Sequence, residues 1–133
     1  MGQNSLVTDE IVAGSEFLHR FNQYMPVKAA FWLQAADSDQ PYLYVASDEL
    51  SDQNFDIAYG EVLRITKEIR STSYLDPFCV RLIYADNPLA QAAVQIEQDY
   101  PAPLNTRFRG SEFGGVSVDD VYIYSPKSFT SQP

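Results

Sequence analysis

The chain has 133 residues, of which 45% are hydrophobic and 14% aromatic, a composition typical of one folded domain and not of a disordered chain. Nine lysines and arginines against eighteen aspartates and glutamates leave a net charge of −9, which repels a nucleic-acid backbone and argues against duplex binding. A single cysteine, Cys79, excludes an internal disulfide and a cysteine-rich zinc site.

No apolar run approaches the length of a membrane span, so no membrane association is expected. The first ten residues carry no basic region followed by an apolar one and therefore predict no signal peptide. A cytoplasmic location is the corresponding expectation. We expect residues 1–8 to be a flexible N-terminus, residues 9–126 a single domain and residues 127–133 a flexible tail.

The first helix is predicted over Asp9–Tyr24, where apolar residues recur on one stripe and Met25-Pro26 ends the helical geometry. Gly14 near its middle weakens this helix slightly. The stripe consists of Ile11, Phe17, Leu18 and Phe21.

Residues 28–47 predict a β-hairpin around which the other elements are arranged. Two runs rich in aromatic and β-branched residues, 31–33 and 42–45, flank a polar turn at 37–41. A helix over residues 27–36 is the alternative, because alanine, leucine and glutamine favour helices. The hairpin is preferred because the segment is short and a strand-like run follows it directly.

The second helix is predicted over Gln53–Arg70, with a cap at Ser51 or Asp52. Its glycine, Gly60, either allows a close approach to the sheet or is simply tolerated at that position. Its buried stripe consists of Phe55, Ala58, Val62, Ile65 and Ile69. The third helix runs from Leu89 to about Gln98, capped by the preceding Asp86-Asn87-Pro88 and stopped by Tyr100-Pro101-Ala102-Pro103.

A third strand is predicted over Phe78–Ala85, with Phe78, Val80 and Leu82 on one side. The last third predicts strands over Thr106–Arg109 and Asp120–Tyr124, joined by a segment whose three glycines imply backbone conformations that other residues avoid. The fold class is therefore α+β, in the order α-β-β-α-β-α-β-β. We expect a two-layer sandwich, with a mainly antiparallel sheet of about five strands, one parallel pair of neighbours and the helices on one face.

Alternation along each strand sorts the sheet residues into two faces, if Leu33 lies opposite Leu43 and Phe31 opposite Val45. The core face collects Phe31, Leu33, Leu43, Val45, Val80, Leu82, Phe108, Val121 and Ile123. The second face collects Trp32, Gln34, Tyr42, Tyr44, Arg81, Arg107, Arg109, Tyr122 and Tyr124.

This second face is the predicted binding face, because aromatic residues and arginines are enriched in protein interfaces. Three coverings remain open: the first helix, a second copy of the chain in a homodimer, or another molecule. The leading hypothesis is a small non-enzymatic interaction or regulatory protein that uses this face for self-association or partner binding. The second is a small-molecule or nucleotide site, in which Arg81, Arg107 and Arg109 hold an anion.

No catalytic residue, metal ligand or cofactor is predicted. The acids Asp48, Asp52 and Asp56 offer oxygen ligands for a divalent metal enzyme, the least favoured hypothesis, because acids at a helix start have an ordinary electrostatic purpose. His19 has no nucleophile placed against it by the sequence and is read as a surface histidine. Cys79, inside an apolar strand, is read as a small buried side chain.

Overall fold

The computed structural model describes residues 8–100 and 105–130 of the chain. Its main elements are α1 (Thr8–Tyr24), β1 (Ala29–Ala35), β2 (Tyr42–Ser47), α2 (Phe55–Glu68), β3 (Val80–Tyr84), α3 (Pro88–Asp99), β4 (Thr106–Phe113), β5 (Val116–Ile123) and α4 (Lys127–Thr130). The predicted α+β class and the order of its eight elements are confirmed, and α4 follows them. None of the helices in the described ranges is long and apolar enough to span a bilayer.

The five strands form one mixed sheet in the order β3-β2-β1-β5-β4. β2 and β3 are parallel, and the other neighbouring pairs are antiparallel. The parallel pair follows from connectivity, because α2 carries the chain from the end of β2 back to the start of β3. The one parallel pair that was expected is therefore present, although it joins β3 to β2 and not to the strand that follows.

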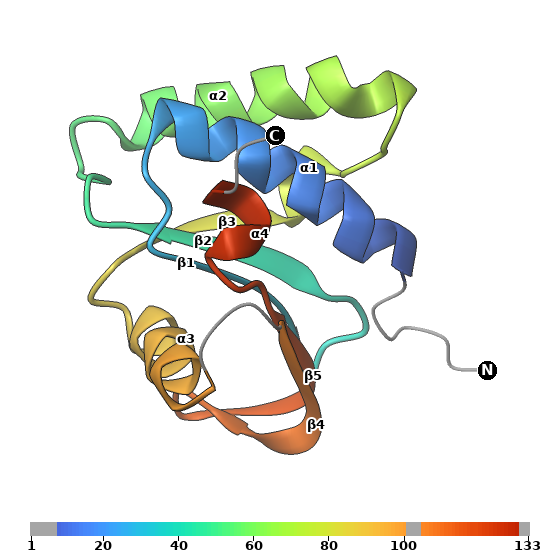
Figure 1. Cartoon of the computed structure of the whole chain (residues 1–133), viewed down its shortest axis with the longest axis vertical. Helices are drawn as coiled ribbons and strands as arrows, with labels where there is room; N and C mark the ends of the chain where they lie inside the picture. The colour runs from blue at the N-terminus through green and yellow to red at the C-terminus, as the bar shows by residue number, and fades with distance from the viewer. Residues whose placement is uncertain (1–7, 101–104, 131–133) are drawn as a thin grey trace.

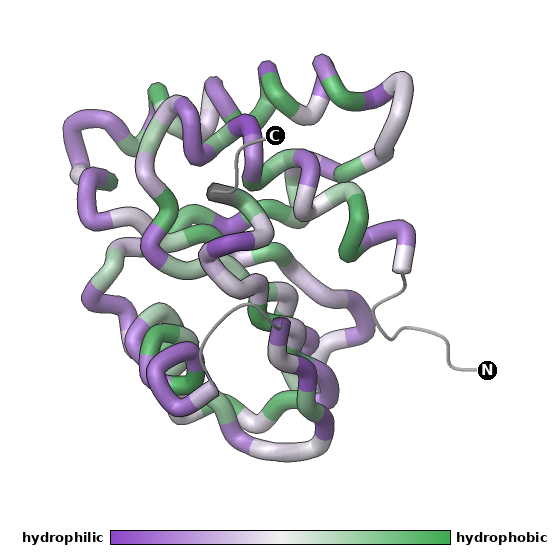
Figure 2. The backbone as a smooth tube through the Cα atoms, in the orientation of Figure 1, coloured by the Kyte–Doolittle hydropathy of each residue, from purple (hydrophilic) through white to green (hydrophobic). Residues whose placement is uncertain are grey.

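Helices cover both faces of the sheet, which corrects the expected two-layer arrangement (Figure 1). One core cluster joins α1, α2 and α4 to the sheet, and a separate cluster joins α3 to the opposite face. Along the helices in Figure 2, hydrophilic and hydrophobic positions succeed each other turn by turn, as expected for elements that bury one side only. Because helices cover both sides, both faces of the sheet carry buried apolar side chains.

The register of the β1–β2 hairpin differs by one residue from the expected one. Trp32 lies opposite Leu43 and Phe31 lies opposite Tyr44. Trp32 therefore shares a face with the core residues of β2, and Phe31 faces α3. Because both faces are covered by helices, the sequence offers no polar face that would have identified the register.

The predicted helices follow their local signals closely. The side chain of Asn87 accepts a hydrogen bond from the amide of Leu89 at 2.8 Å, and Pro88 occupies the first turn of α3. In α2, the stripe residues Ala58, Val62 and Ile65 are buried. The expected cap at Ser51 or Asp52 is wrong, since Asn54 is the residue before the helix. The predicted stop at 101–103 lies outside the described residues.

Gly14, and not Gly60, is the glycine that allows a helix to approach the sheet. A Cβ atom on Gly14 would lie 2.4 Å from the Tyr124 hydroxyl and 2.8 Å from Trp32 Nε1. Around Gly60 no atom lies within 4 Å of the equivalent position. The absent side chain of Gly14 thus lets α1 rest directly on a buried polar pair.

The β4–β5 hairpin is longer than the sequence predicted. Gly114 and Gly115 form its two-residue turn with φ of 60° and 87°, and Gly110 has φ of 63°, so the expectation for these glycines is confirmed. The β1–β5 register shifts between Gln34 and Ala35. This shift is a bulge in β5, opposite β1, and it falls beside the buried carboxylate of Asp120.

The chain after Pro126 is more ordered than expected. Residues 127–130 form α4, and the Phe129 ring, 1% exposed, belongs to the core that α1 covers. The expectation of a flexible tail is therefore wrong for this turn. The remaining parts of the expected flexible ends, residues 1–7 and 131–133, lie outside the described residues.

Candidate functional site

The structure divides the predicted binding face between the two sides of the sheet. The members on β1, β4 and β5 face α1, whereas those on β2 and β3 face α3. The first group comprises Trp32, Arg107, Arg109, Tyr122 and Tyr124, and the second comprises Tyr42, Tyr44 and Arg81. The predicted alternation of side chains is correct within each group. The error lies in the expected register between β1 and β2, which had placed the two groups on one face.

Trp32 and Tyr124 are core residues, each 1% exposed. The Tyr124 hydroxyl accepts a hydrogen bond from Trp32 Nε1 at 3.0 Å and donates to the carbonyl of Ile11 at 2.6 Å. Burial raises the pKa of Tyr124 well above its ordinary value. The first helix thus covers this part of the face, which was one of the three open alternatives.

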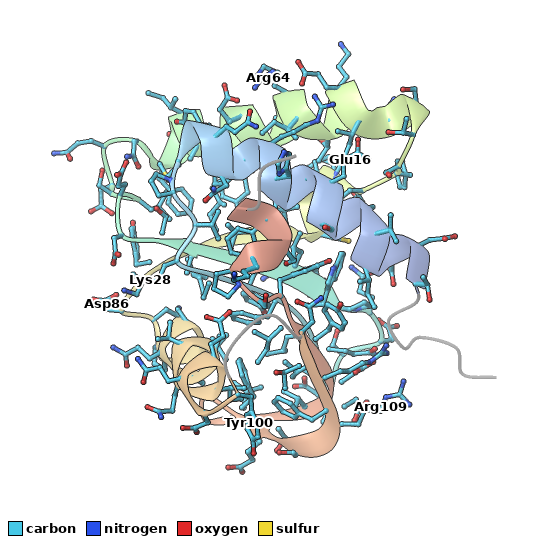
Figure 3. All side chains as sticks on the ribbon, viewed as in Figure 1. Glu16, Lys28, Arg64, Asp86, Tyr100 and Arg109 are labelled. Atoms are coloured by element: carbon cyan, nitrogen blue, oxygen red, sulfur yellow. The ribbon has the colours of Figure 1, made fainter. Side chains whose placement is uncertain are left out.

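Arg107 and Arg109 flank the carboxylate of Asp120, a side chain only 3% exposed. Arg107 donates from Nη2 at 2.7 Å and from Nε at 3.1 Å, and these hydrogen bonds raise the pKa of its guanidinium. Arg109 approaches the same carboxylate to 3.7 Å and projects outward from the hairpin (Figure 3). Since Arg81 lies on the opposite face, the three arginines do not converge on one anion.

The second group surrounds an exposed arginine. The Arg81 guanidinium carbon lies 4.1 Å from the centre of the Tyr42 ring, a cation–π arrangement. Tyr44 stacks on Phe31 with ring centres 5.3 Å apart, and burial raises the pKa of its hydroxyl. Tyr42 and Tyr44 are both half-buried, so the exposed Arg81 is the most accessible member of this group.

Phe78 is the most exposed large hydrophobic residue in the described ranges, at 82%. Instead of continuing β3, residues Pro77–Cys79 form a short 3-10 turn, and the Asp76 side chain accepts a hydrogen bond from the Phe78 amide at 2.9 Å. The expectation that Phe78 points inward with Val80 and Leu82 is therefore wrong. The signal was present in Asp76-Pro77, the same acceptor-and-proline pattern that starts α3.

Cys79 follows Phe78 in this turn and is half-buried, not fully buried as expected. The amide of Gln40 approaches its sulfur to 3.9 Å. Burial, with the nearby carboxylate of Asp76, raises the pKa of the thiol, which lowers its reactivity as a nucleophile. We call the surface formed by Tyr42, Phe78, Cys79 and Arg81 the β3-edge patch.

The outer edge of β3 is closed by a side chain from α2. The Tyr59 hydroxyl donates to the carbonyl of Val80 at 3.1 Å and accepts from the amide of Leu82 at 3.0 Å. An edge strand with free backbone groups invites an additional strand. Because Tyr59 occupies these two groups, recognition at the β3-edge patch would rely on side chains.

The acidic group at the start of α2 is dispersed. Asp48 pairs with Lys28 at 3.5 Å, and Asp52 accepts a hydrogen bond from the Tyr84 hydroxyl at 2.5 Å. That bond raises the pKa of Tyr84. Throughout residues 8–100 and 105–130, no three histidine, cysteine, aspartate or glutamate side chains gather closely enough to hold a metal ion.

A groove of about 580 Å³ lies between α1 and β5, and sequence reasoning did not identify it. Residues of α1 form one wall, and Asn105, Tyr122, Tyr124 and Ser128 form the other. The walls come from segments about a hundred residues apart, so only the tertiary structure brings them together. We call this hollow the α1–β5 groove, and His19 lines it.

Comparisons of the chain with protein-family models, with curated proteins and with solved structures found no match.

Proposed function

We propose that this chain is a small cytoplasmic, non-enzymatic binding protein that associates through the β3-edge patch, first of all with a second copy of itself. The observation that carries the proposal is the exposure of Phe78, a large hydrophobic residue that is 82% exposed. Leaving such a ring in water forgoes about 1.5–3 kcal/mol that burial would contribute. An interface that covers the ring would recover this free energy.

The turn that holds Phe78 favours binding, because its backbone is fixed before a partner arrives. The Asp76 carboxylate accepts from the Phe78 amide, and the Cys79 amide donates to the carbonyl of Asp76 at 2.9 Å. A side chain on a fixed backbone loses less conformational entropy on association than one on a free loop. Phe78 is therefore preorganised as an anchor.

The other members of the β3-edge patch have the composition of an interface. Arg81 is exposed and stacked on Tyr42, so its planar guanidinium is already oriented. Tyrosine and arginine dominate the binding energy of many interfaces. In a symmetric dimer the same patch would meet itself, placing the Phe78 rings of the two copies near the centre.

The test is the mass of the protein measured by light scattering over a range of concentrations, for the wild type and for Phe78→Ala and Arg81→Ala. Ile57→Ala is the matched control, because Ile57 is 64% exposed on α2 and lies outside the patch. We expect a dimeric wild type, a dimeric Ile57 variant and monomeric patch variants. A monomeric wild type would refute self-association, and a dimer that both patch substitutions leave intact would refute self-association through the β3-edge patch.

A further inference from the structure

The α1–β5 groove has the size of a ligand site and lies on the face of the sheet opposite the side chains of Tyr42 and Arg81. Its volume of about 580 Å³ falls within the range of about 300–1,000 Å³ that small-molecule sites occupy. One wall presents Ser15, Glu16, His19 and Arg20 from α1. Tyr122 of β5 and Tyr124, which directly follows this strand, lie on the other wall.

Several side chains in this groove have N–H or O–H groups that could still donate a hydrogen bond to a ligand. Within the described part of the chain, the His19 imidazole and the Ser15 hydroxyl make no hydrogen bond. The Tyr122 hydroxyl accepts from Asn105 Nδ2 at 2.7 Å and keeps its own proton to donate. Arg20 uses one terminal nitrogen, Nη1, for Glu68 at 3.1 Å and has further N–H groups.

The acceptors in the groove are mostly engaged. Glu16 accepts from the hydroxyl groups of Thr72 and Ser73 at distances of 2.8–3.2 Å. The Tyr124 hydroxyl is used in both directions, and the Ser128 hydroxyl donates to a backbone carbonyl. Donors with spare capacity therefore outnumber acceptors, which suits a ligand rich in acceptors, such as a carboxylate or a phosphate.

The groove also offers a flat aromatic surface. The rings of Tyr122 and Tyr124 meet edge to face, with centres 5.1 Å apart, and Tyr122 is only half-buried. An exposed ring face accepts another ring by stacking. We propose that the α1–β5 groove binds a small anion that carries an aromatic ring, with the ring on Tyr122 and the anionic group held by His19, Arg20 and the Tyr122 hydroxyl.

The test is an NMR titration of the full chain, followed through backbone amide shifts, with phenyl phosphate and benzoate as probes. Benzylammonium is the matched cationic probe, and inorganic phosphate is the matched probe without a ring. We expect shifts confined to α1, the end of β5 and α4, with benzylammonium and inorganic phosphate each binding about tenfold more weakly. Phenyl phosphate against benzoate distinguishes a phosphate from a carboxylate ligand.

Two substitutions test the residues named. Tyr122→Phe keeps the ring and removes the hydroxyl, and His19→Ala removes the imidazole; each is expected to weaken phenyl phosphate binding about tenfold. Arg109→Ala is the control, because Arg109 faces the same side of the sheet but does not line the groove. Unchanged binding in both variants, equal binding of benzylammonium, or no shift at about 20 mM phenyl phosphate would overturn the proposal.

Discussion

The clearest stability prediction concerns Glu97, a glutamate on the sheet-facing side of α3. Its Oε2 atom is buried, and no group in the described residues hydrogen-bonds to it. Burial raises the pKa of Glu97 from 4.5 to about 7. The folded state therefore holds a proton that the unfolded state releases, so the carboxyl contributes stability that is complete below pH 4.5 and is lost as the pH rises through 7.

The size of this loss follows from the difference between the two pKa values. At about 1.4 kcal/mol per pKa unit, the whole shift from 4.5 to about 7 corresponds to a loss of about 3.4 kcal/mol of unfolding free energy once the pH has risen from below both pKa values to above both. Glu97 is half-buried, and solvent screening reduces the expected loss to about 1–2 kcal/mol. For a chain of this length the corresponding fall in Tm is about 3–8 °C.

Glu97→Gln removes the titrating group while keeping the shape of the side chain. We expect the variant to match the wild type near pH 4.5 and to exceed it by about 1–2 kcal/mol at pH 8, because a neutral amide is cheaper to bury than a carboxylate. Urea unfolding followed by fluorescence at several pH values measures both. Exposed Glu112→Gln is the control. Parallel stability curves for the wild type and the Glu97 variant from pH 5 to 8 would refute the reasoning.

Two matched pairs of substitutions and one single substitution test the packing, each by urea unfolding. Gly14→Ala is expected to cost about 1–3 kcal/mol by overpacking, whereas Gly60→Ala, with open space around it, should gain about 0.4–1 kcal/mol. Arg107→Ala, which leaves a buried carboxylate without its closest partner, should cost about 2–4 kcal/mol, against less than about 0.5 kcal/mol for the more exposed Arg109→Ala. Tyr59→Phe uncovers the edge of β3 and should cost about 1–2 kcal/mol, with a greater tendency to aggregate seen by light scattering.

The helices were predictable because their signals are local. A buried stripe at helical spacing, an acceptor side chain and a proline at the start of α3 need no knowledge of the rest of the chain. The same holds for the glycines of the last hairpin, whose positive φ values follow from their missing side chains. Gly14 is different, because its role depends on Tyr124, which lies 110 positions later in the sequence.

The binding face could not be assembled from the sequence, for a physical reason that concerns the join between β1 and β2. Phe31 and Trp32 are both large and apolar, so alternation alone does not say which of them shares a face with Leu43. With helices on both sides of the sheet, either register buries an aromatic ring. Tertiary packing decides between the two registers. In the observed one, Trp32 Nε1 donates a hydrogen bond to the Tyr124 hydroxyl, and the Phe31 ring stacks on the ring of Tyr44.

The local sequence around Phe78 explains the exposure on which the proposed function depends. Alternation with Val80 would have buried the ring, but Asp76 and Pro77 turn the backbone first and direct it to solvent. If β3 began at Phe78 instead of Val80, alternation would place the ring on the buried side with Val80. The turn therefore exposes an apolar group that the fold does not need to expose, which is the arrangement expected when the ring serves an interface.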